Sequence, residues 1–179
     1  MRLRRSGDAA TIASPRTPTM EIDTRTLLKL AAERTQDNKL VVAFANQQYL
    51  EVLLNWLVAL KRLGIRNYLI ISLDQDIHSF LAERGFASFL APLAGSLRQL
   101  WMMRLQIFRA LCRNGVDFIH SDADAVWLRN PIPDYFSDPT CDIVASQGTI
   151  WPPDILRTQG FVFCCGFFYV RSCTATRAL

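Results

Sequence analysis

Short apolar runs alternate with amphipathic segments along most of the chain, and this alternation constrains the fold more than any other feature. The runs are rich in β-branched and other apolar residues, as in strands that are buried on both faces of a sheet. The segments between them have the apolar spacing of surface helices. We expect strands at 39–45, 67–73, 86–92 and 116–121, and helices at 22–35, 48–64, 74–85 and 96–115.

This order predicts an α/β protein with a Rossmann-like, mostly parallel sheet and helices on both faces. After residue 131 the rhythm changes, because 141–147 and 160–172 both read as strands and we expect mixed pairing there. The polar, Pro/Thr/Ser-rich residues 1–20 are predicted to be a flexible leader, and 21–179 a single domain. The last predicted strand comes close to Leu179, so we expect the C-terminal part of the domain to be missing.

The charge distribution disfavours a nucleic-acid-binding protein. Residues 1–20 hold four of the 20 basic residues and one of the 16 acidic ones, which leaves the predicted domain nearly neutral. No basic stripe interleaved with aromatic residues is present, so we expect no nucleic-acid partner. No run approaches the roughly 18 apolar residues of a membrane span. Two histidines and the lack of a C-x-x-C pair argue against a zinc site.

An acidic pair, Asp122 and Asp124, directly follows the predicted strand 116–121. Ligands of open α/β sheets bind beyond the carboxyl ends of the strands. Two carboxylates separated by one small residue, Ala123, can bind one hard cation such as Mn²⁺ or Mg²⁺, which keeps positions open for phosphate oxygens. Apolar residues flank the pair on both sides, which favours a metal site over the alternative, a solvated acidic turn.

Arg104 is predicted to lie in the middle of the apolar face of helix 96–115, an arc that also includes Leu97 and Trp101. A buried guanidinium requires an anionic partner. We expect Arg104 either to brace the acidic pair or to contact a diphosphate. The alternatives are a structural ion pair elsewhere and a side chain that extends out of the end of the helix.

Further binding candidates follow the first two predicted strands. Ala45 and Asn46 come after the first strand and Asp74 after the second, where a nucleotide base and ribose would bind in a mononucleotide-binding half. Ser121 and Ala123, on either side of Asp122, complete the predicted cofactor-binding set. His120 is interpreted as a packed residue rather than a catalytic one.

Three classes of function fit a strand followed by D-x-D. They are nucleotide-sugar transfer, a haloacid-dehalogenase-type phosphohydrolase, and a catalytically inactive nucleotide-sugar-binding module. The phosphohydrolase requires a lysine downstream of its nucleophilic aspartate, but the lysines at 29, 39 and 61 all precede Asp122. Dinucleotide oxidoreductases and P-loop enzymes are excluded because neither glycine motif occurs.

The segments "VVAFANQQYLEVLLNWLVALKRLGI", "IFRALCRNGVDFIHSDADAVWLRNPIPDYF" and "CGFFYVRS" resemble the nucleotide-diphospho-sugar transferase family that includes plant rhamnogalacturonan xylosyltransferases and arabinosyltransferases. The resemblance runs from about Leu40 to Ser172 and is most specific in "SDADAVWLRNP". One departure is the stretch 146–148, Ser-Gln-Gly, where members often carry an acidic residue.

This resemblance implies a GT-A fold and a glycosyltransferase that moves a hexose or pentose from a nucleotide-diphospho-sugar donor to a glycan or glycoprotein acceptor. It also implies retention of anomeric configuration, and a Mn²⁺-type ion at Asp122 and Asp124. Arg104 matches a basic position often found on the helix before the D-x-D strand. A Golgi location is implied as well, with an anchor outside this sequence.

Overall fold

The computed structural model describes residues 22–93 and 95–178, and the predicted leader, 1–20, lies outside the described residues. Four parallel strands form the first part of a six-stranded sheet whose order is β3-β2-β1-β4-β6-β5. These four are β1 (Lys39–Ala45), β2 (Tyr68–Ser72), β3 (Ser88–Leu90) and β4 (Asp117–Ser121). The predicted α/β fold with a mostly parallel sheet is confirmed.

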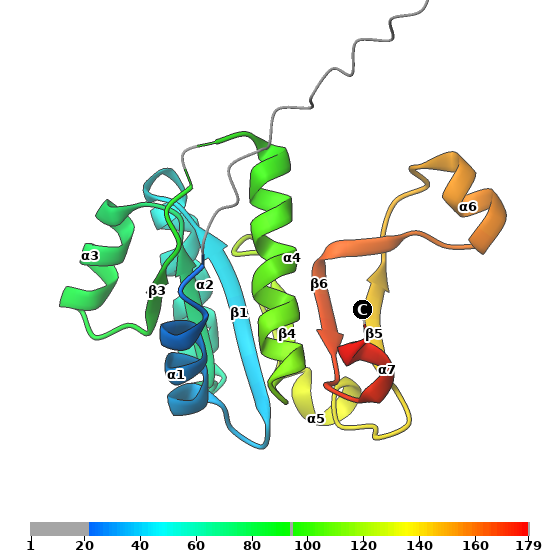
Figure 1. Cartoon of the computed structure of the whole chain (residues 1–179), viewed down its shortest axis with the longest axis horizontal. Helices are drawn as coiled ribbons and strands as arrows, with labels where there is room; N and C mark the ends of the chain where they lie inside the picture. Colours follow the sequence, from blue (N-terminus) through cyan, green and yellow to red (C-terminus); the bar gives the residue numbers. More distant parts are fainter. Residues whose placement is uncertain (1–21, 94, 179) are drawn as a thin grey trace, which may run out of the picture.

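Helices cover both faces of the parallel strands (Figure 1). On one face lie α1 (Thr24–Arg34) and α4 (Leu97–Arg113), and on the other α2 (Leu50–Arg62) and α3 (Gln75–Glu83). The shorter elements are η1 (Gln47–Tyr49), α5 (Ile132–Tyr135), α6 (Pro153–Gln159) and α7 (Thr174–Arg177). Among the helices of the described ranges, none has the length and apolar character needed to cross a membrane.

Strand β1 shows why the apolar runs become central strands. Val41 and Ala43 face the cluster formed with α2 and α3, whereas Leu40 and Val42 face the cluster formed with α1 and α4. All four side chains are fully buried. Because alternate residues of a strand point to opposite faces, an uninterrupted apolar run is required when helices cover both.

The last two strands, β5 (Ile143–Gln147) and β6 (Phe163–Val170), are antiparallel to their neighbours. β6 pairs with β4, and β5 forms the edge of the sheet. The mixed pairing predicted after residue 131 is therefore confirmed. The β5–β6 register shifts between Ala145 and Gln147, and β6 bulges over residues 164–167. Such a bulge redirects backbone and side-chain groups.

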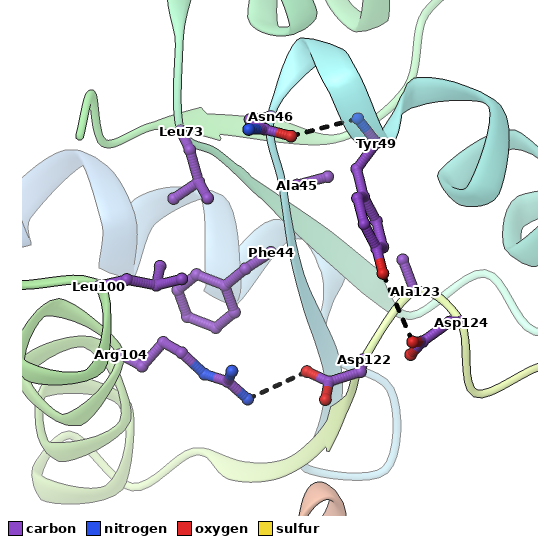
Figure 2. A pocket seen from close by; sticks show the side chains of 10 residues that line it. All are labelled: Phe44, Ala45, Asn46, Tyr49, Leu73, Leu100, Arg104, Asp122, Ala123 and Asp124. Carbon is purple, nitrogen blue, oxygen red and sulfur yellow. Dashed lines mark hydrogen bonds and ion pairs between the residues drawn. The ribbon is translucent and has the colours of Figure 1, made fainter. Parts of the chain in front are cut away.

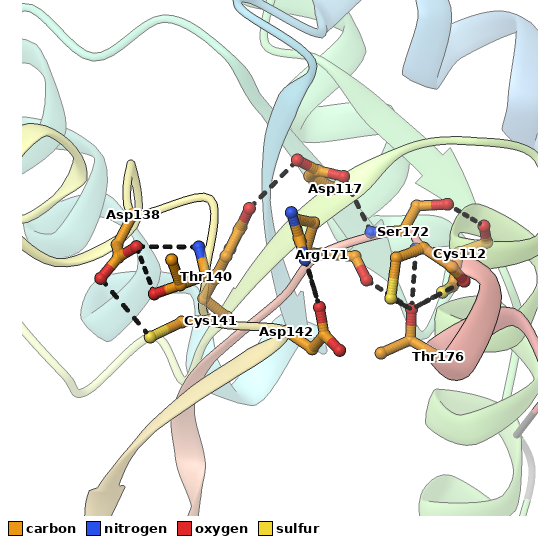
Figure 3. Close-up of polar contacts among 11 residues, drawn as sticks. Cys112, Asp117, Asp138, Thr140, Cys141, Asp142, Arg171, Ser172 and Thr176 are labelled. Carbon is orange, nitrogen blue, oxygen red and sulfur yellow. Dashed lines mark hydrogen bonds and ion pairs between the residues drawn. The ribbon is translucent and has the colours of Figure 1, made fainter.

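A polar network at the start of β4 and the end of β6 holds these two strands together (Figure 3). The buried carboxylate of Asp117 accepts hydrogen bonds from the Tyr169 hydroxyl at 3.0 Å and the Ser172 backbone N–H at 2.8 Å. Arg171 forms an ion pair with Asp142 beside it. Burial and the neighbouring Asp117 raise the pKa of Tyr169. The hydroxyl therefore stays protonated and remains a donor.

Replacing Tyr169 with phenylalanine is expected to lower the free energy of unfolding by about 1.5–3 kcal/mol, because a buried carboxylate loses a charge-assisted hydrogen bond. Urea unfolding measures the change. Tyr135→Phe, at a half-exposed tyrosine on α5, is the matched control and should change stability by less than about 0.5 kcal/mol. Equal stabilities of the two variants would contradict a supporting role for the Tyr169–Asp117 bond.

Candidate functional site

A pocket of about 270 Å³ lies at the carboxyl ends of β1 and β4, where open α/β sheets bind ligands (Figure 2). It brings together six of the residues predicted from the sequence with four that were not. The predicted ones are Ala45, Asn46, Arg104, Asp122, Ala123 and Asp124, and the others are Phe44, Tyr49, Leu73 and Leu100.

Asp122 is held firmly through one of its carboxylate oxygens. Its Oδ1 accepts a hydrogen bond from Arg104 Nη2 at 3.1 Å and lies 3.1 Å from His120 Nε2. Its backbone N–H donates to the Gly166 carbonyl at 2.7 Å. No hydrogen bond within the described ranges engages Oδ2. Asp122 is therefore oriented by protein groups and keeps one oxygen available for a ligand.

The bulge of β6 forms the floor beside this carboxylate. A Cβ atom at Gly166 would lie 2.6 Å from Asp122 Oδ2, which is closer than real Cβ atoms approach. The carbonyl of the preceding residue, Cys165, accepts a hydrogen bond from Arg104 Nη2 at 3.2 Å. This close approach of the β6 backbone supports both members of the Arg104–Asp122 pair.

Arg104 is buried, with 6% of its surface exposed, as its place in the apolar arc predicted. It contacts Asp122 and His120, and its guanidinium lies 4.5 Å from the Trp101 ring centroid. Its Nε is a buried donor without a partner among the described residues. Among the roles expected for Arg104, bracing the acidic pair fits best. Its hydrogen bond goes to Asp122, the first member of the pair.

The expectation that the whole apolar arc of α4 is buried is wrong for its first turns. Leu97 is 69% exposed and Trp101 39% exposed. Figure 1 shows that this end of α4 reaches beyond the carboxyl ends of the strands, so no sheet lies beneath it. Trp101 instead packs on the guanidinium of Arg104 at the rim of the pocket.

The Asp122 carboxylate and the His120 imidazole both have pKa values below their usual ones. Burial raises the pKa of Asp122, but the hydrogen bond with His120 and the charge of Arg104 outweigh it and bring that pKa below its usual value. Burial lowers the pKa of His120, whose Nδ1 lies 3.1 Å from the Val42 carbonyl. His120 is fully buried, as expected of a packed residue, and it packs directly against the site.

Asp124 lies at the open side of the pocket. Its side chain is exposed, and its Oδ2 is 3.5 Å from the Tyr49 hydroxyl. Of the apolar residues that follow the pair, Val126 is 40% exposed and Leu128 92% exposed, so this flank is not buried throughout. The chain turns sharply after β4, with the Ala125 N–H bonded to the Asp122 carbonyl, and Trp127 returns to the core.

Two predicted binding residues do not line the pocket. Ser121 is fully buried, and its Oγ accepts hydrogen bonds from the indole N–H groups of Trp56 at 3.1 Å and Trp127 at 3.0 Å. Asp74 caps α3 through the Ile77 N–H at 2.9 Å and also accepts from the Gln47 N–H at 2.7 Å. Asp74 therefore stabilises the loop that follows β1 from outside the pocket.

Tyr49 is the main pocket residue that the sequence interpretation missed. It is positioned by Asn46, whose side-chain oxygen accepts a hydrogen bond from the Tyr49 N–H at 3.1 Å and caps the short helix η1. A side-chain acceptor three residues before an N–H is a capping signal that is visible in the sequence. It could have placed Tyr49 beside Asn46 at the end of β1.

The two carboxylates at the site have the ligand chemistry that a hard divalent cation prefers. In the described ranges no three His, Cys, Asp or Glu residues are arranged to bind a metal. The chain instead offers the free Oδ2 of Asp122 and the exposed carboxylate of Asp124. Mg²⁺ and similar ions commonly bind one or two carboxylates, with waters and substrate phosphates completing the coordination.

Comparisons with curated proteins give relatives in one group of enzymes, all from Arabidopsis thaliana. "Arabinosyltransferase XEG113" is 24% identical over 84% of this chain and 26% of its own length. "Beta-arabinofuranosyltransferase RAY1" is 27% identical over 62% of this chain and 23% of its own, and "Arabinosyltransferase RRA2" 24% identical over 93% and 46%. The chain thus spans less than half the length of each of these relatives.

Among solved structures, the glycosyltransferase GlyE of Streptococcus pneumoniae TIGR4 is similar with a TM-score of 0.46 and 16% identity, over 74% of this chain and 33% of that one. The family model described as nucleotide-diphospho-sugar transferase matches residues 63–179, a range that includes Arg104, the acidic pair and β6. The chain therefore belongs to the nucleotide-diphospho-sugar transferase family.

Proposed function

We propose that this chain carries the donor site of a metal-dependent glycosyltransferase. The observation that supports the proposal best is the pocket at the carboxyl edge of the sheet, which Asp122, Asp124 and Arg104 line together. A free carboxylate oxygen, an exposed carboxylate and a buried cation are the groups expected around a metal-bound diphosphate.

The acidic pair would hold Mn²⁺ or Mg²⁺ through Oδ2 of Asp122 and the carboxylate of Asp124. Such an ion neutralises negative charge on a departing diphosphate. Arg104 keeps Asp122 oriented through their 3.1 Å hydrogen bond and adds fixed positive charge to the wall of the pocket. Groups that are already oriented need no rearrangement as the charge develops.

The apolar side of the pocket suits a nucleoside. Phe44 and Leu73 supply apolar surface, Asn46 supplies an amide, and Tyr49 supplies an aromatic ring with a hydroxyl that reaches toward Asp124. A planar base can stack on such a ring while ribose hydroxyls bond to polar groups at the strand end. The expected assignment of Ala45 and Asn46 to nucleotide binding is therefore part of the proposal.

For the reaction, the relatives named as arabinosyltransferases support a pentose donor. We extend the proposal accordingly to transfer of a pentosyl group to a glycan or glycoprotein acceptor. From the family resemblance, we also propose that the transferred sugar keeps its anomeric configuration and that the enzyme acts in the Golgi lumen.

The test is a thermal-stability screen of UDP- and GDP-sugars with and without Mn²⁺. At a ligand concentration of about 100 times Kd, binding should stabilise the fold by about 2.7 kcal/mol and raise Tm by roughly 5–10 °C. EDTA should abolish the shift, because the acidic pair alone repels a diphosphate. The absence of a Mn²⁺-dependent shift with every nucleotide sugar would contradict the proposal.

A further inference from the structure

The connection between β5 and β6 exposes large apolar side chains. We define residues 148–163 as the aromatic arm, which includes α6. Ile150 is 76% exposed, Trp151 71%, Phe161 43% and Phe163 55%. None of these four belongs to the core clusters of the described residues. Side chains of this size are seldom exposed together unless they contact a partner.

The aromatic arm lies at the same end of the sheet as the acidic pair, the end at which the parallel strands finish. Figure 1 shows α6 beyond the end at which β1 stops, with α5 at the opposite end. Phe163 is three residues before Gly166, whose carbonyl bonds to the Asp122 N–H. At about 3.3 Å per residue, Phe163 at the start of β6 lies roughly 10 Å at most along the strand from Gly166.

The aromatic arm is rich in aromatic and aliphatic side chains and carries no net charge. Its two charged residues, Asp154 and Arg157, form an exposed ion pair with each other at 2.7 Å. Its other polar side chains are hydroxyls and an amide, Thr149, Thr158 and Gln159. Phe161 and Phe163 meet edge to face with their ring centroids 4.9 Å apart. A nucleic acid would require unpaired basic residues for its phosphates.

A neutral sugar chain matches this surface. Each sugar ring has apolar C–H faces, which aromatic rings cover, and a rim of hydroxyls, which amides and hydroxyls bind. We propose that the aromatic arm binds a neutral oligosaccharide and presents it as the acceptor to the donor pocket. This inference rests on the proposed function, because the arm would otherwise have no transfer reaction to serve.

The test titrates the full chain, with UDP and Mn²⁺ present, with arabinotetraose as the neutral probe and tetragalacturonate as the anionic one. Calorimetry should detect the neutral probe preferentially. Trp151→Ala should weaken its binding about tenfold or more, whereas Trp151→Tyr, which keeps a ring, should retain most of the affinity. Tyr135→Ala, at an exposed ring on α5, is the matched control and should have no effect.

Unchanged affinity in Trp151→Ala, or no binding of the neutral probe by the unaltered chain, would overturn the inference. So would a dimer in sedimentation experiments that Trp151→Ala dissolves, since the arm would then bind a second copy. UDP and Mn²⁺ binding is measured separately in each variant. Failure of the unaltered chain to bind UDP would contradict the donor site, whereas an unaltered chain that binds UDP but not the neutral oligosaccharide would contradict the role of the arm alone.

Discussion

Asp124→Asn is expected to reduce Mn²⁺-dependent affinity for UDP about a hundredfold or more. The substitution keeps the shape of the side chain but removes one of two carboxylates available to the ion, and a bound metal supplies several kcal/mol of charge stabilisation. Asp124 is exposed and its one described side-chain contact is the 3.5 Å approach of the Tyr49 hydroxyl, so the fold should be unaffected. Calorimetric titration with UDP, with and without Mn²⁺, measures the loss.

The matched control is Asp134→Asn, an exposed acidic residue of α5 at the far end of the sheet. It removes the same charge from the surface and should leave affinity for UDP unchanged. If Asp124→Asn and Asp134→Asn bind UDP equally well in Mn²⁺, the acidic pair does not hold the ion. If both lose affinity equally, general surface charge rather than a site is responsible.

Gly166→Ala is expected to abolish Mn²⁺-dependent UDP binding and to lower the free energy of unfolding by about 1–3 kcal/mol. The new methyl group would lie 2.6 Å from Asp122 Oδ2, so the carboxylate must move from its place beside Arg104. The φ of Gly166 lies outside the left-handed region, so the backbone itself accepts alanine. Urea unfolding and calorimetry measure the two effects.

Cys164→Ala is the control, because it lies in the same bulge and adds no atom. A double variant sharpens the test. If the methyl group acts by displacing Asp122, then Gly166→Ala should cost much less stability in an Asp122→Ala background than in the unaltered chain. If the stability losses of Gly166→Ala and Asp122→Ala simply add in the double variant, the glycine is required by the conformation of β6 and not by the position of the carboxylate.

The parallel part of the fold could be predicted because its signals are local. β1 was expected at 39–45 and is found at Lys39–Ala45, since burial on both faces requires an uninterrupted apolar run. The third strand is expected at 86–92 but covers only Ser88–Leu90, at the edge of the sheet. An edge strand pairs with one neighbour only and is less covered by other elements, so fewer of its positions require apolar residues.

The place of β6 could not be predicted from local pattern. The sequence indicates a strand at 160–172 but carries no local record that it pairs with β4. That pairing is set by contacts between distant residues, such as the bond from Tyr169 to Asp117. The same holds for the bulge that directs the carbonyls of Cys165 and Gly166 toward the site.

At the site, the sequence predicted correctly those pocket residues whose position depends only on where the parallel strands end. Asn46 and Asp122 line the pocket because β1 and β4 are parallel neighbours that end at the same edge. Ser121 and Asp74 were expected there on the same grounds, but each is engaged by partners outside the pocket. The indole of Trp56 that binds Ser121 is 65 residues away in sequence, beyond any local signal.

Strand β6 follows every other strand in the sequence, yet it lies inside the sheet, between β4 and β5. During synthesis, a nascent chain therefore displays Asp122 and Arg104 well before the two carbonyls that steady them emerge. Such long-range pairing is slow to form. Under the proposed function, donor binding therefore has to wait until β6 has paired with β4.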